Sequence, residues 1–238
     1  MKTVLLTGPA RGLGLAISQR LVSDGYRVIG VGRTLTPEYQ ALMDGEGTAH
    51  FIGYDVGDLA GIPALVKRVT TEHGPLYGLV NNAAVGLDGV LATMHASDIS
   101  SVLRVNLEAP IVLTKYACRS MLVRGEGRIV HVSSIIARTG FNGLSVYGAS
   151  KAGLEGFARS LSRELGRAGI TVNCVAPGFM ETDMTRGLEG AKLESIRRRA
   201  PLGLPHVADA AGAVAYLLSG DAGRITGTSV TVDGGSTA

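Results

Sequence analysis

The chain has 238 residues, of which 34 are glycine; 45% are hydrophobic and 18% are charged. Its 23 Lys and Arg residues stand against 20 Asp and Glu residues, which leaves a formal net charge of +3. This apolar content excludes an intrinsically disordered chain, and two cysteines without metal-ligand spacing exclude a disulfide scaffold. No apolar run approaches the roughly 18 residues that a membrane helix needs, and the first run is too short for a signal peptide. We therefore expect a cytoplasmic globular protein with no membrane partner.

Runs of β-branched and other apolar residues predict seven strands, near residues 3–7, 26–32, 48–54, 76–81, 128–133, 170–175 and 228–232. These runs are continuously hydrophobic rather than alternating, which is typical of parallel strands buried on both faces. Longer amphipathic stretches separate them. The alternation predicts an α/β fold: one domain over residues 1–238, built as a doubly wound, Rossmann-like parallel sheet.

Capping residues mark three expected helix starts: Thr36, before Pro37; Asp58, before a helix to about His73; and Ser97 or Asp98, before a helix to about Arg124. Only segment 177–206 breaks the alternation. It is bracketed by prolines, holds one short predicted helix, and is interpreted as a lid over a binding site.

A glycine-rich loop, Thr7–Gly14, follows the first strand and opens the first helix. Such a turn lets the backbone approach a pyrophosphate, which the helix N-terminus stabilises. The alternative is that these glycines merely allow a tight turn. The position of the loop between strand and helix, rather than the pattern itself, favours a dinucleotide.

The second strand ends at Arg33, where an NAD-binding protein carries an acidic residue. An arginine at this place accommodates a 2′-phosphate, and Arg11 in the glycine loop could bracket the same phosphate. The sequence therefore predicts NADP(H) as cofactor. In the alternative interpretation, Arg33 is an ordinary solvated residue.

Tyr147 and Lys151 lie four residues apart at the start of a predicted helix, so their side chains share one face. A nearby ammonium favours the phenolate, and we expect Lys151 to lower the pKa of Tyr147 toward the neutral range. The alternative is a surface pair without chemistry.

Together with Asn81-Asn82-Ala83-Ala84 after the fourth strand and Pro177-Gly178 after the sixth, these motifs make the chain resemble the short-chain dehydrogenase/reductase family over essentially its full length. The resemblance implies an NADP-dependent oxidoreductase acting on CH–OH or C=O groups. It also implies a catalytic set of Asn106, Ser134, Tyr147 and Lys151. Ser134 is chosen over Ser133 because it lies thirteen residues before the tyrosine.

Roles follow from the resemblance. Tyr147 would protonate the carbonyl oxygen, Lys151 would tune it and hold the nicotinamide ribose, and Ser134 would donate a hydrogen bond to the substrate oxygen. Asn106 would hold a water in a proton relay. Pro110 has no N–H to offer the carbonyl of Asn106, so we expect a kink that leaves this carbonyl available; the alternative is a kink that serves packing alone.

The loop and the resemblance together imply these cofactor-binding residues: Gly8, Arg11, Gly12, Leu13, Gly14, Arg33, Asp55, Val56, Asn82, Ala83, Tyr147, Lys151, Pro177, Gly178, Met180 and Thr182. Asp55 and Val56 would lie at the adenine, Asn82 near the adenosine ribose, and Met180 and Thr182 near the nicotinamide amide. Ala84 replaces the usual glycine, and Pro9 replaces a small residue with an N–H. The histidines show no ligand spacing, so no metal is expected.

Residues 170–185 and 225–235 look most like the beta-ketoacyl acyl-carrier-protein reductases of fatty acid biosynthesis. Members dock an acidic carrier through basic residues beside the site, and Arg124 and Arg167 lie near, but not at, the expected positions. The predicted lid holds Arg186, Lys192 and Arg197–Arg199 against Glu189 and Glu194. This net charge of +3 could steer an anionic thioester carrier, or it could be an ordinary solvated helix face.

Three functions stay open: an NADPH-dependent reductase of acyl thioesters, a reductase or dehydrogenase of another small ketone, secondary alcohol or sugar, and a catalytically silent NADP-binding sensor or assembly subunit. Retention of all four catalytic residues counts against the last. No interleaving of aromatic and basic residues indicates nucleic acid as a partner. The family resemblance implies a homotetramer.

Overall fold

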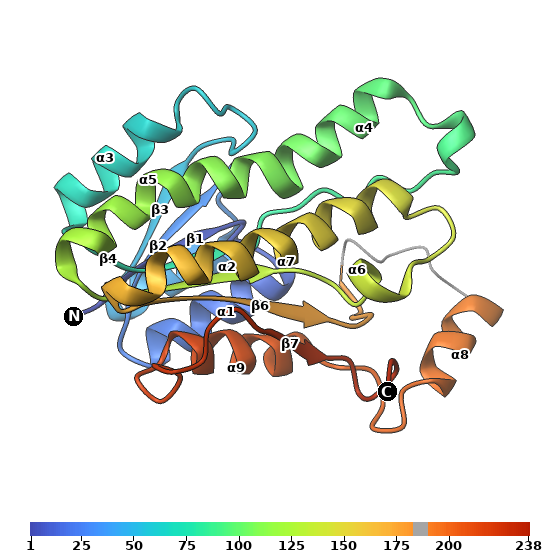
Figure 1. The fold of residues 1–238 in the computed structure, drawn as a ribbon. Coiled ribbons are helices and arrows are strands. Elements are labelled where there is room, and N and C mark those ends of the chain that lie inside the picture. The colour runs from blue at the N-terminus through green and yellow to red at the C-terminus, as the bar shows by residue number, and fades with distance from the viewer. Residues whose placement is uncertain (183–189) are drawn as a thin grey trace.

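A seven-stranded parallel sheet forms the centre of the molecule (Figure 1), in the order β3-β2-β1-β4-β5-β6-β7. The computed structural model describes residues 1–182 and 190–238. The strands are β1 (Thr3–Thr7), β2 (Arg27–Gly32), β3 (Ala49–Gly53), β4 (Leu76–Asn81), β5 (Gly127–Val132), β6 (Ile170–Pro177) and β7 (Ser229–Val232). All seven predicted strands are confirmed, with ends within two residues of those expected.

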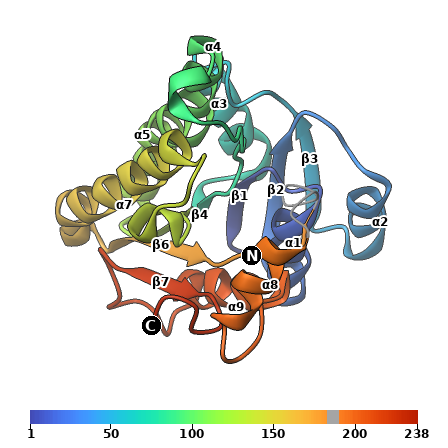
Figure 2. The ribbon, with the colours of Figure 1, turned by 90° about the vertical axis from the view of Figure 1, so that its right-hand side faces the viewer.

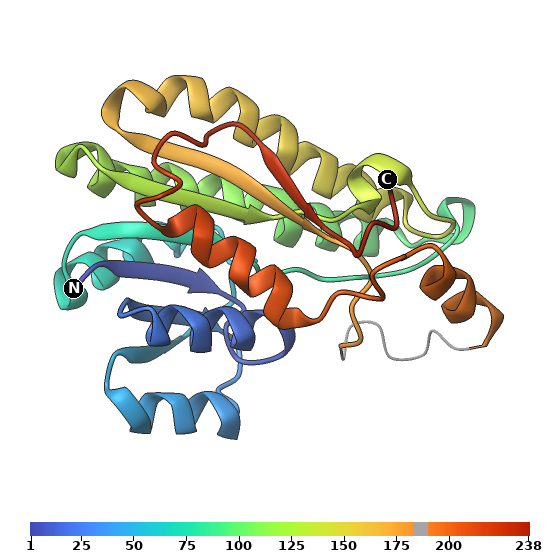
Figure 3. The same ribbon diagram turned by 90° about the horizontal axis from the view of Figure 1, so that it is seen from below.

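Helices cover both faces of the sheet, as the doubly wound prediction requires. The helices that pack on one face are α3 (Ile62–His73), α5 (Ala109–Arg124) and α7 (Ser145–Leu165). Those on the other face are α1 (Gly12–Ser23), α2 (Pro37–Glu46) and α9 (Val207–Leu218). Figure 3 shows α1 and α9 side by side under the sheet. Each face has its own apolar core, so the central strands β1, β4, β5 and β6 are buried along their whole length.

One of the three expected helix starts is confirmed. The Thr36 hydroxyl accepts a hydrogen bond from the Tyr39 amide at 3.3 Å and caps α2. The start at Asp58 is wrong, because α3 begins at Ile62, where Pro63 fits the first turn. The Asp58 carboxylate instead accepts a hydrogen bond from the Gly61 amide in the preceding turn, at 3.3 Å.

The expected start at Ser97 or Asp98 is also wrong. Helix α4 (Ala96–Leu103) begins directly after His95, so both residues lie inside its first turn. The cap position is occupied by His95, whose backbone is extended. The carboxylate of Asp98, in the first turn, still complements the positive N-terminal end of the helix dipole.

The long helical stretch is interrupted before Pro110, as predicted. A π-helical turn, η2 (Arg104–Glu108), joins α4 to α5, and the Ala109 amide donates to the Arg104 carbonyl five residues back. A proline two residues into α5 offers no amide hydrogen, which favours a wider turn at this place. Asn106 lies in the middle of that turn. Whether its carbonyl is available to a water stays a prediction.

The predicted lid contains the expected short helix, α8 (Ala191–Arg198), beyond the carboxyl ends of the strands (Figure 2). Arg186 and Glu189 fall outside the described residues, and the side chain of Lys192 is not described. Among the described residues, no helix combines the length and the apolar character that would let it cross a bilayer.

Candidate active site

The candidate site lies along the carboxyl edge of the sheet, which faces the viewer in Figure 2. Because all strands are parallel, the segments that follow them meet at this edge. β1 is flanked by β2 on one side and β4 on the other. The connections that leave β1 and those that lead on from β4 therefore run in opposite directions across the sheet, and such a switch point leaves a crevice at the carboxyl ends of the strands. The residues that follow successive strands include Gly8, Arg33, Asp55, Asn82, Ser134 and Gly178, all of them predicted site residues.

The glycine loop folds tightly between β1 and α1. Gly8 and Gly12 adopt φ values of +65° and +51°, a backbone region that favours glycine. A Cβ on Gly14 would lie 1.8 Å from the Gly8 carbonyl oxygen, so no side chain fits there. The loop can therefore present backbone amides and the first turn of α1 to an anionic group.

Asn82 holds this loop to the end of β4. Its amide nitrogen donates to the carbonyl oxygens of Thr7 at 3.0 Å and Gly8 at 2.9 Å. The Thr7 hydroxyl accepts from the backbone amides of Asn82 and Ala83, both at 3.0 Å. The four bonds join the two strands on either side of the crevice. The structure thus gives Asn82 a loop-holding position beside the place where the resemblance expects the adenosine ribose.

The two arginines expected at the cofactor phosphate are exposed. Arg11 directly precedes α1, and Arg33 directly follows β2. The Thr36 hydroxyl donates to the Ala10 carbonyl at 2.8 Å and ties the two segments together. Within residues 1–182 and 190–238, neither guanidinium makes a hydrogen bond or ion pair, so both can bind an added anion.

Two other predicted cofactor residues occupy different surroundings. Asp55 is exposed, and its carboxylate accepts a hydrogen bond from the Gly57 amide at 2.9 Å. Val56 is buried in the apolar core with α3. The side chain of Val56 therefore packs into the protein, and only its backbone could face an adenine.

The segment after β6 crosses toward the glycine loop. The Pro177 carbonyl accepts from the Ile135 amide at 3.0 Å, and the Gly178 amide donates to the Val232 carbonyl at 2.8 Å. A Cβ built on Gly12 would lie 3.7 Å from the Thr182 side chain. Met180 and Thr182 are both partly buried along this crossing. The expected cofactor residues on β1 and β6 are thus brought close together.

Ser133 and Ser134, at the end of β5, point to different surroundings. The Ser133 side chain is buried and contacts α7, with its hydroxyl 3.3 Å from the Lys151 carbonyl oxygen. The Ser134 hydroxyl accepts from the Ile136 amide at 3.2 Å and interacts with the Tyr147 phenol. The geometry therefore favours Ser134, as the spacing did.

Lys151 is buried beneath Tyr147. Its ammonium nitrogen donates to the Val132 carbonyl at 2.8 Å and lies 5.6 Å from the centre of the Tyr147 ring. Burial lowers the pKa of Lys151 to about 8. Burial also raises the pKa of the Tyr147 phenol, and it is the largest influence on that pKa. The hydrogen bond with Ser134 lowers the same pKa, and the nearby Asp88 carboxylate raises it further.

The expectation that Lys151 lowers the pKa of Tyr147 is therefore wrong for this structure. The ammonium is directed to a backbone carbonyl rather than to the phenol oxygen, so the cost of burying a phenolate dominates.

Asn106 is completely buried and fully engaged. Its carbonyl oxygen accepts from the Val85 amide at 2.8 Å, and its amide nitrogen donates to the Val85 carbonyl at 2.9 Å and contacts the Ser150 hydroxyl at 3.3 Å. The side chain thereby joins the loop after β4 to α7. The backbone of Asn106, not its side chain, is left for the predicted water.

The residue missed by sequence reasoning is Glu155. It is buried and lies one turn beyond Lys151 on α7, so Tyr147, Lys151 and Glu155 form a stripe at four-residue spacing. That spacing was visible in the sequence. An acidic residue one turn beyond the expected catalytic lysine, on the same helix face, is the signal that could have drawn attention to it; its burial is seen only in the structure.

The basic residues considered for carrier docking separate into two groups. Arg124 ends α5 and Arg167 lies in η3 (Gly166–Ala168), directly before β5 and β6. Both therefore lie at the amino end of the strands, away from Tyr147, and neither flanks the site within this chain. Arg197 and Arg198, at the end of α8, and Arg199, directly after it, are all exposed. Arg197 is paired with Glu181 at 2.8 Å and Glu194 at 3.2 Å, and Arg199 donates to the Ser195 carbonyl at 3.3 Å.

Among the described residues, no group of three or more His, Cys, Asp or Glu side chains could hold a metal ion.

Comparison with known proteins places these features in context. The family model described as short chain dehydrogenase matches residues 2–192. The chain is 39% identical to the 3-oxoacyl-[acyl-carrier-protein] reductase FabG of Escherichia coli, covering 98% of this chain and 96% of that one. It is 37% identical to the 3-oxoacyl-[acyl-carrier-protein] reductase MabA of Mycobacterium avium, covering 98% and 89%.

Solved structures with the same fold include a gluconate 5-dehydrogenase from Burkholderia cenocepacia in complex with NADP and tartrate. Its TM-score is 0.94 at 27% identity, with 99% of this chain and 95% of that chain covered. A variant of a short-chain dehydrogenase/reductase from Serratia marcescens superposes with a TM-score of 0.92 at 33% identity, covering 100% and 98%.

Proposed function

Because this chain belongs to the short-chain dehydrogenase/reductase family, whose members are oxidoreductases acting on CH–OH and C=O groups, we propose that it reduces a β-ketoacyl thioester to the β-hydroxyacyl form with NADPH. The reductase names of its relatives at 37–39% identity over nearly the full chain support this substrate class.

The observation that carries the proposal is the placement of Ser134 against Tyr147, with Lys151 buried beneath them. The raised pKa of Tyr147 keeps its phenol protonated at neutral pH, which suits a proton donor to a carbonyl oxygen. The Ser134 hydroxyl lies beside it and would donate a hydrogen bond to the same oxygen, where negative charge develops.

The chain fits NADP(H) at the edge of the sheet. The tight glycine loop and the N-terminus of α1 suit the pyrophosphate, and the exposed guanidiniums of Arg11 and Arg33 suit a 2′-phosphate. Bound NADPH supplies the hydride. The Lys151 ammonium, 5.6 Å from the centre of the Tyr147 ring, could hold the nicotinamide ribose by exchanging its bond to the Val132 carbonyl.

Exposed apolar side chains beside the site favour an acyl substrate over a sugar. Leu87, Val90 and Leu91 follow β4, and Phe141 follows β5; all four are exposed. The Gly89 amide donates to the Gly143 carbonyl at 2.9 Å, so the two loops lie together. Asp88, in the same loop, is close enough to influence the Tyr147 phenol. An acyl chain would cover this apolar surface, whereas a polyol would leave it exposed to water.

Arg198 at the end of α8 and Arg199 directly after it would attract an anionic carrier, and acyl carrier protein is therefore the partner we propose for the thioester. The homotetramer implied by the family resemblance is the assembly we propose.

A different reductase activity is the second candidate. The likeness to gluconate 5-dehydrogenase shows that the same fold accommodates a sugar acid, and the two chains share 27% identity. A catalytically silent NADP-binding subunit is the least favoured function, because Ser134, Tyr147 and Lys151 are all retained and lie together.

A substrate panel tests the proposal. Loss of NADPH absorbance is followed with an acetoacetyl thioester, a 5-keto sugar acid and a simple neutral ketone at equal concentration. We expect kcat/KM for the thioester to exceed the other two by at least about tenfold. Preference for the keto sugar acid would instead support the second candidate, and binding of NADPH without turnover of any ketone would support a silent subunit.

A further inference from the structure

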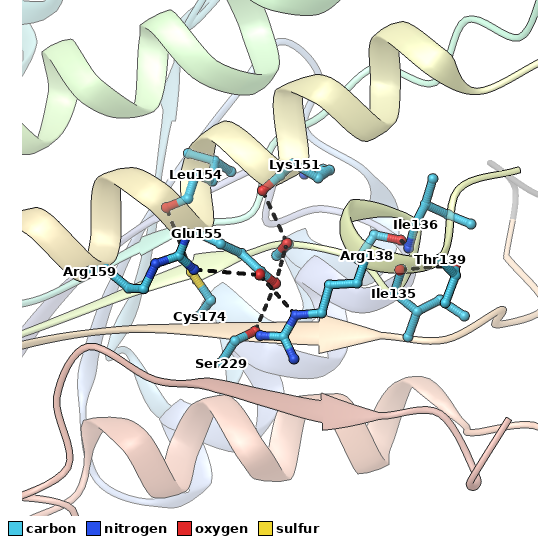
Figure 4. Close-up of polar contacts among 12 residues, drawn as sticks. Ile135, Ile136, Arg138, Thr139, Lys151, Leu154, Glu155, Arg159, Cys174 and Ser229 are labelled. Carbon is cyan, nitrogen blue, oxygen red and sulfur yellow. Dashed lines mark hydrogen bonds and ion pairs between the residues drawn. The ribbon is translucent and has the colours of Figure 1, made fainter. Parts of the chain in front are cut away.

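A buried carboxylate lies behind the candidate catalytic residues, at the position of Glu155 in the middle of α7 (Figure 4). Its side chain is only 5% exposed. A buried carboxylate is costly unless it is hydrogen-bonded and paired with a cation, so its partners show what holds it there. None of the roles derived above for Asn106, Ser134, Tyr147 and Lys151 uses it.

Both carboxylate oxygens of Glu155 are engaged. Oε1 lies 3.2 Å from the Ser133 hydroxyl and accepts a hydrogen bond from the Ser229 hydroxyl at 2.9 Å. Oε2 accepts a hydrogen bond from Nε of Arg138 at 3.0 Å, and Arg159 adds a weaker ion pair at 4.0 Å. Figure 4 shows the Glu155 carboxylate between the side chains of Arg159 and Arg138, with Ser229 below it.

Glu155 and its partners bring four parts of the fold together. Ser133 follows β5, Arg138 lies in the short helix α6 (Ile136–Thr139), and Ser229 opens β7, while Glu155 itself belongs to α7. Ser133 precedes Ser134 in the chain and Arg138 follows it. The Glu155 carboxylate therefore binds the segment that carries Ser134 at a residue before it and a residue after it. Tyr147 lies two turns earlier on the helix that carries Glu155. The carboxylate thus joins the elements that bear the two groups expected to touch the substrate oxygen.

The end of β5 has a second attachment to α7, the bond from Lys151 to the Val132 carbonyl. In the proposed function, this ammonium turns to the nicotinamide ribose, and the bond is given up. The Ser133 hydroxyl reaches α7 at two points, the Glu155 carboxylate at 3.2 Å and the Lys151 backbone carbonyl at 3.3 Å, and neither contact depends on the Lys151 ammonium. These contacts would therefore persist while the reaction proceeds.

We propose that Glu155 is a positioning residue, which holds Ser134 against Tyr147 through Ser133 and Arg138 and so keeps the proton-donating pair aligned. This inference rests on the proposed function. It also predicts that Glu155 holds Ser134 against Tyr147 in the unliganded protein. Ser133 acts as the matching donor, and Ser229 serves to anchor β7 without a role in the alignment.

The test compares Glu155→Gln and Ser133→Ala with two matched controls. Ser229→Ala removes a donor to the same carboxylate oxygen from the β7 side, and Glu164→Gln removes an exposed carboxylate from the same helix. We expect kcat to fall about tenfold in Glu155→Gln and in Ser133→Ala, because small misplacements of reacting groups are expensive. The Kd for NADPH and the KM should stay within about twofold, and both controls should keep the native kcat.

The pH dependence separates alignment from general stability. The Ser134 interaction lowers the pKa of the Tyr147 phenol, so a misplaced Ser134 raises that pKa. The alkaline fall in kcat for ketone reduction should therefore move to higher pH in Glu155→Gln and in Ser133→Ala. A loss of stability alone lowers the melting temperature but leaves the pH of the alkaline fall in kcat unchanged.

The same shift can be followed without turnover, by titrating ¹³C-labelled tyrosine in the unliganded protein and assigning Tyr147 with Tyr147→Phe. A raised phenol pKa in Glu155→Gln and in Ser133→Ala supports the proposal even if no ketone is reduced, in which case only the proposed function fails. An unchanged phenol pKa in both variants overturns the inference. So does a Ser229→Ala variant that loses as much kcat as Ser133→Ala.

Discussion

The two halves of the carboxyl edge are built in opposite ways. Around β1, β2 and β3, the side chains expected at the cofactor are exposed: Arg11, Arg33 and Asp55. Around β5, β6 and α7, the polar side chains are buried at 0–2% exposure and bonded to the protein: Asn106, Ser133 and Lys151. One half awaits a ligand, whereas the other is completed by its own hydrogen bonds.

This difference shows where each half gets its stability. Exposed guanidiniums cost little to fold and gain their partner only on binding, so they tune affinity and selectivity rather than stability. Buried polar groups must be satisfied internally, and each bond therefore also fixes a geometry. Substitutions in the two halves should accordingly affect different measured quantities.

The largest expected effect is on the catalytic side. Tyr147→Phe removes the proposed proton donor while keeping the ring, so kcat should fall about 10³-fold. Since the ring remains in place, the melting temperature and the Kd for NADPH should change little. Steady-state kinetics and fluorescence titration with NADPH measure both. Turnover close to native would disprove the proposed mechanism.

On the cofactor side, Arg33→Ala should lower kcat/KM for NADPH by about 10- to 100-fold, the loss of one or two charge-assisted hydrogen bonds to a phosphate. The kcat/KM for NADH should stay within about twofold of the native value. The melting temperature should stay within about one degree of that of the native protein. Arg68→Ala, which removes an exposed arginine paired with Glu72 on α3, is the matched control. If the native enzyme used NADH as efficiently as NADPH, the interpretation of Arg33 would be wrong.

Lys151→Met should separate stability from activity in the catalytic half. Burial lowers the pKa of Lys151 to about 8, so keeping this ammonium charged at pH 7 costs the fold on the order of 3 kcal/mol. Lys151→Met removes this cost, but it also removes the hydrogen bond to the Val132 carbonyl, which offsets ~1–2 kcal/mol of the gain in stability. The variant should lose most activity, yet melt a few degrees higher than the native protein at pH 7.

The sign of this effect also fixes its pH dependence. Between the folded pKa near 8 and the unfolded value near 10.5, the unfolded chain binds more protons at Lys151, so native stability rises with pH across this window. The advantage of Lys151→Met should shrink as pH rises from 8 to 10. A variant less stable than native at pH 7 would contradict the assigned cost.

The smallest effect is expected at the end of α8. Reversing the exposed charges with Arg198→Glu and Arg199→Glu should raise KM several-fold for carrier-linked thioesters in low salt and leave a small neutral ketone unaffected. Arg197 contributes less because it is paired with Glu181 and Glu194. An equal rise in KM for both substrates would indicate a solvated helix face without a steering role.

The sequence predicted the sheet well because buried parallel strands leave a strong local signal of continuous apolar residues, as in Ile170–Val175. Helix starts were harder. At Asp58, the cap residue signal was outweighed by Pro63, which fits only the first turn of α3.

In the candidate site, short motifs gave the residues but not their partners. Lys151 was expected to act on Tyr147, but its ammonium meets the Val132 carbonyl, a backbone group that no pattern of side chains can reveal. Glu155 was missed for a related reason: its partners Ser133, Arg138 and Ser229 are 22, 17 and 74 residues away in sequence. Only the fold brings them together.

The contrast between the two halves can be measured by hydrogen–deuterium exchange of the native protein with and without saturating NADPH. We predict that amides in residues 8–14 and 33–36 gain protection on binding, because that half is completed by the ligand. Residues 133–135 should show slow exchange already in the unliganded protein and little change, since Ser133 donates to the Val175 carbonyl at 2.7 Å and Ile135 to the Pro177 carbonyl at 3.0 Å. Fast exchange at residues 133–135 that slows as strongly as in the glycine loop would contradict a catalytic half assembled in advance.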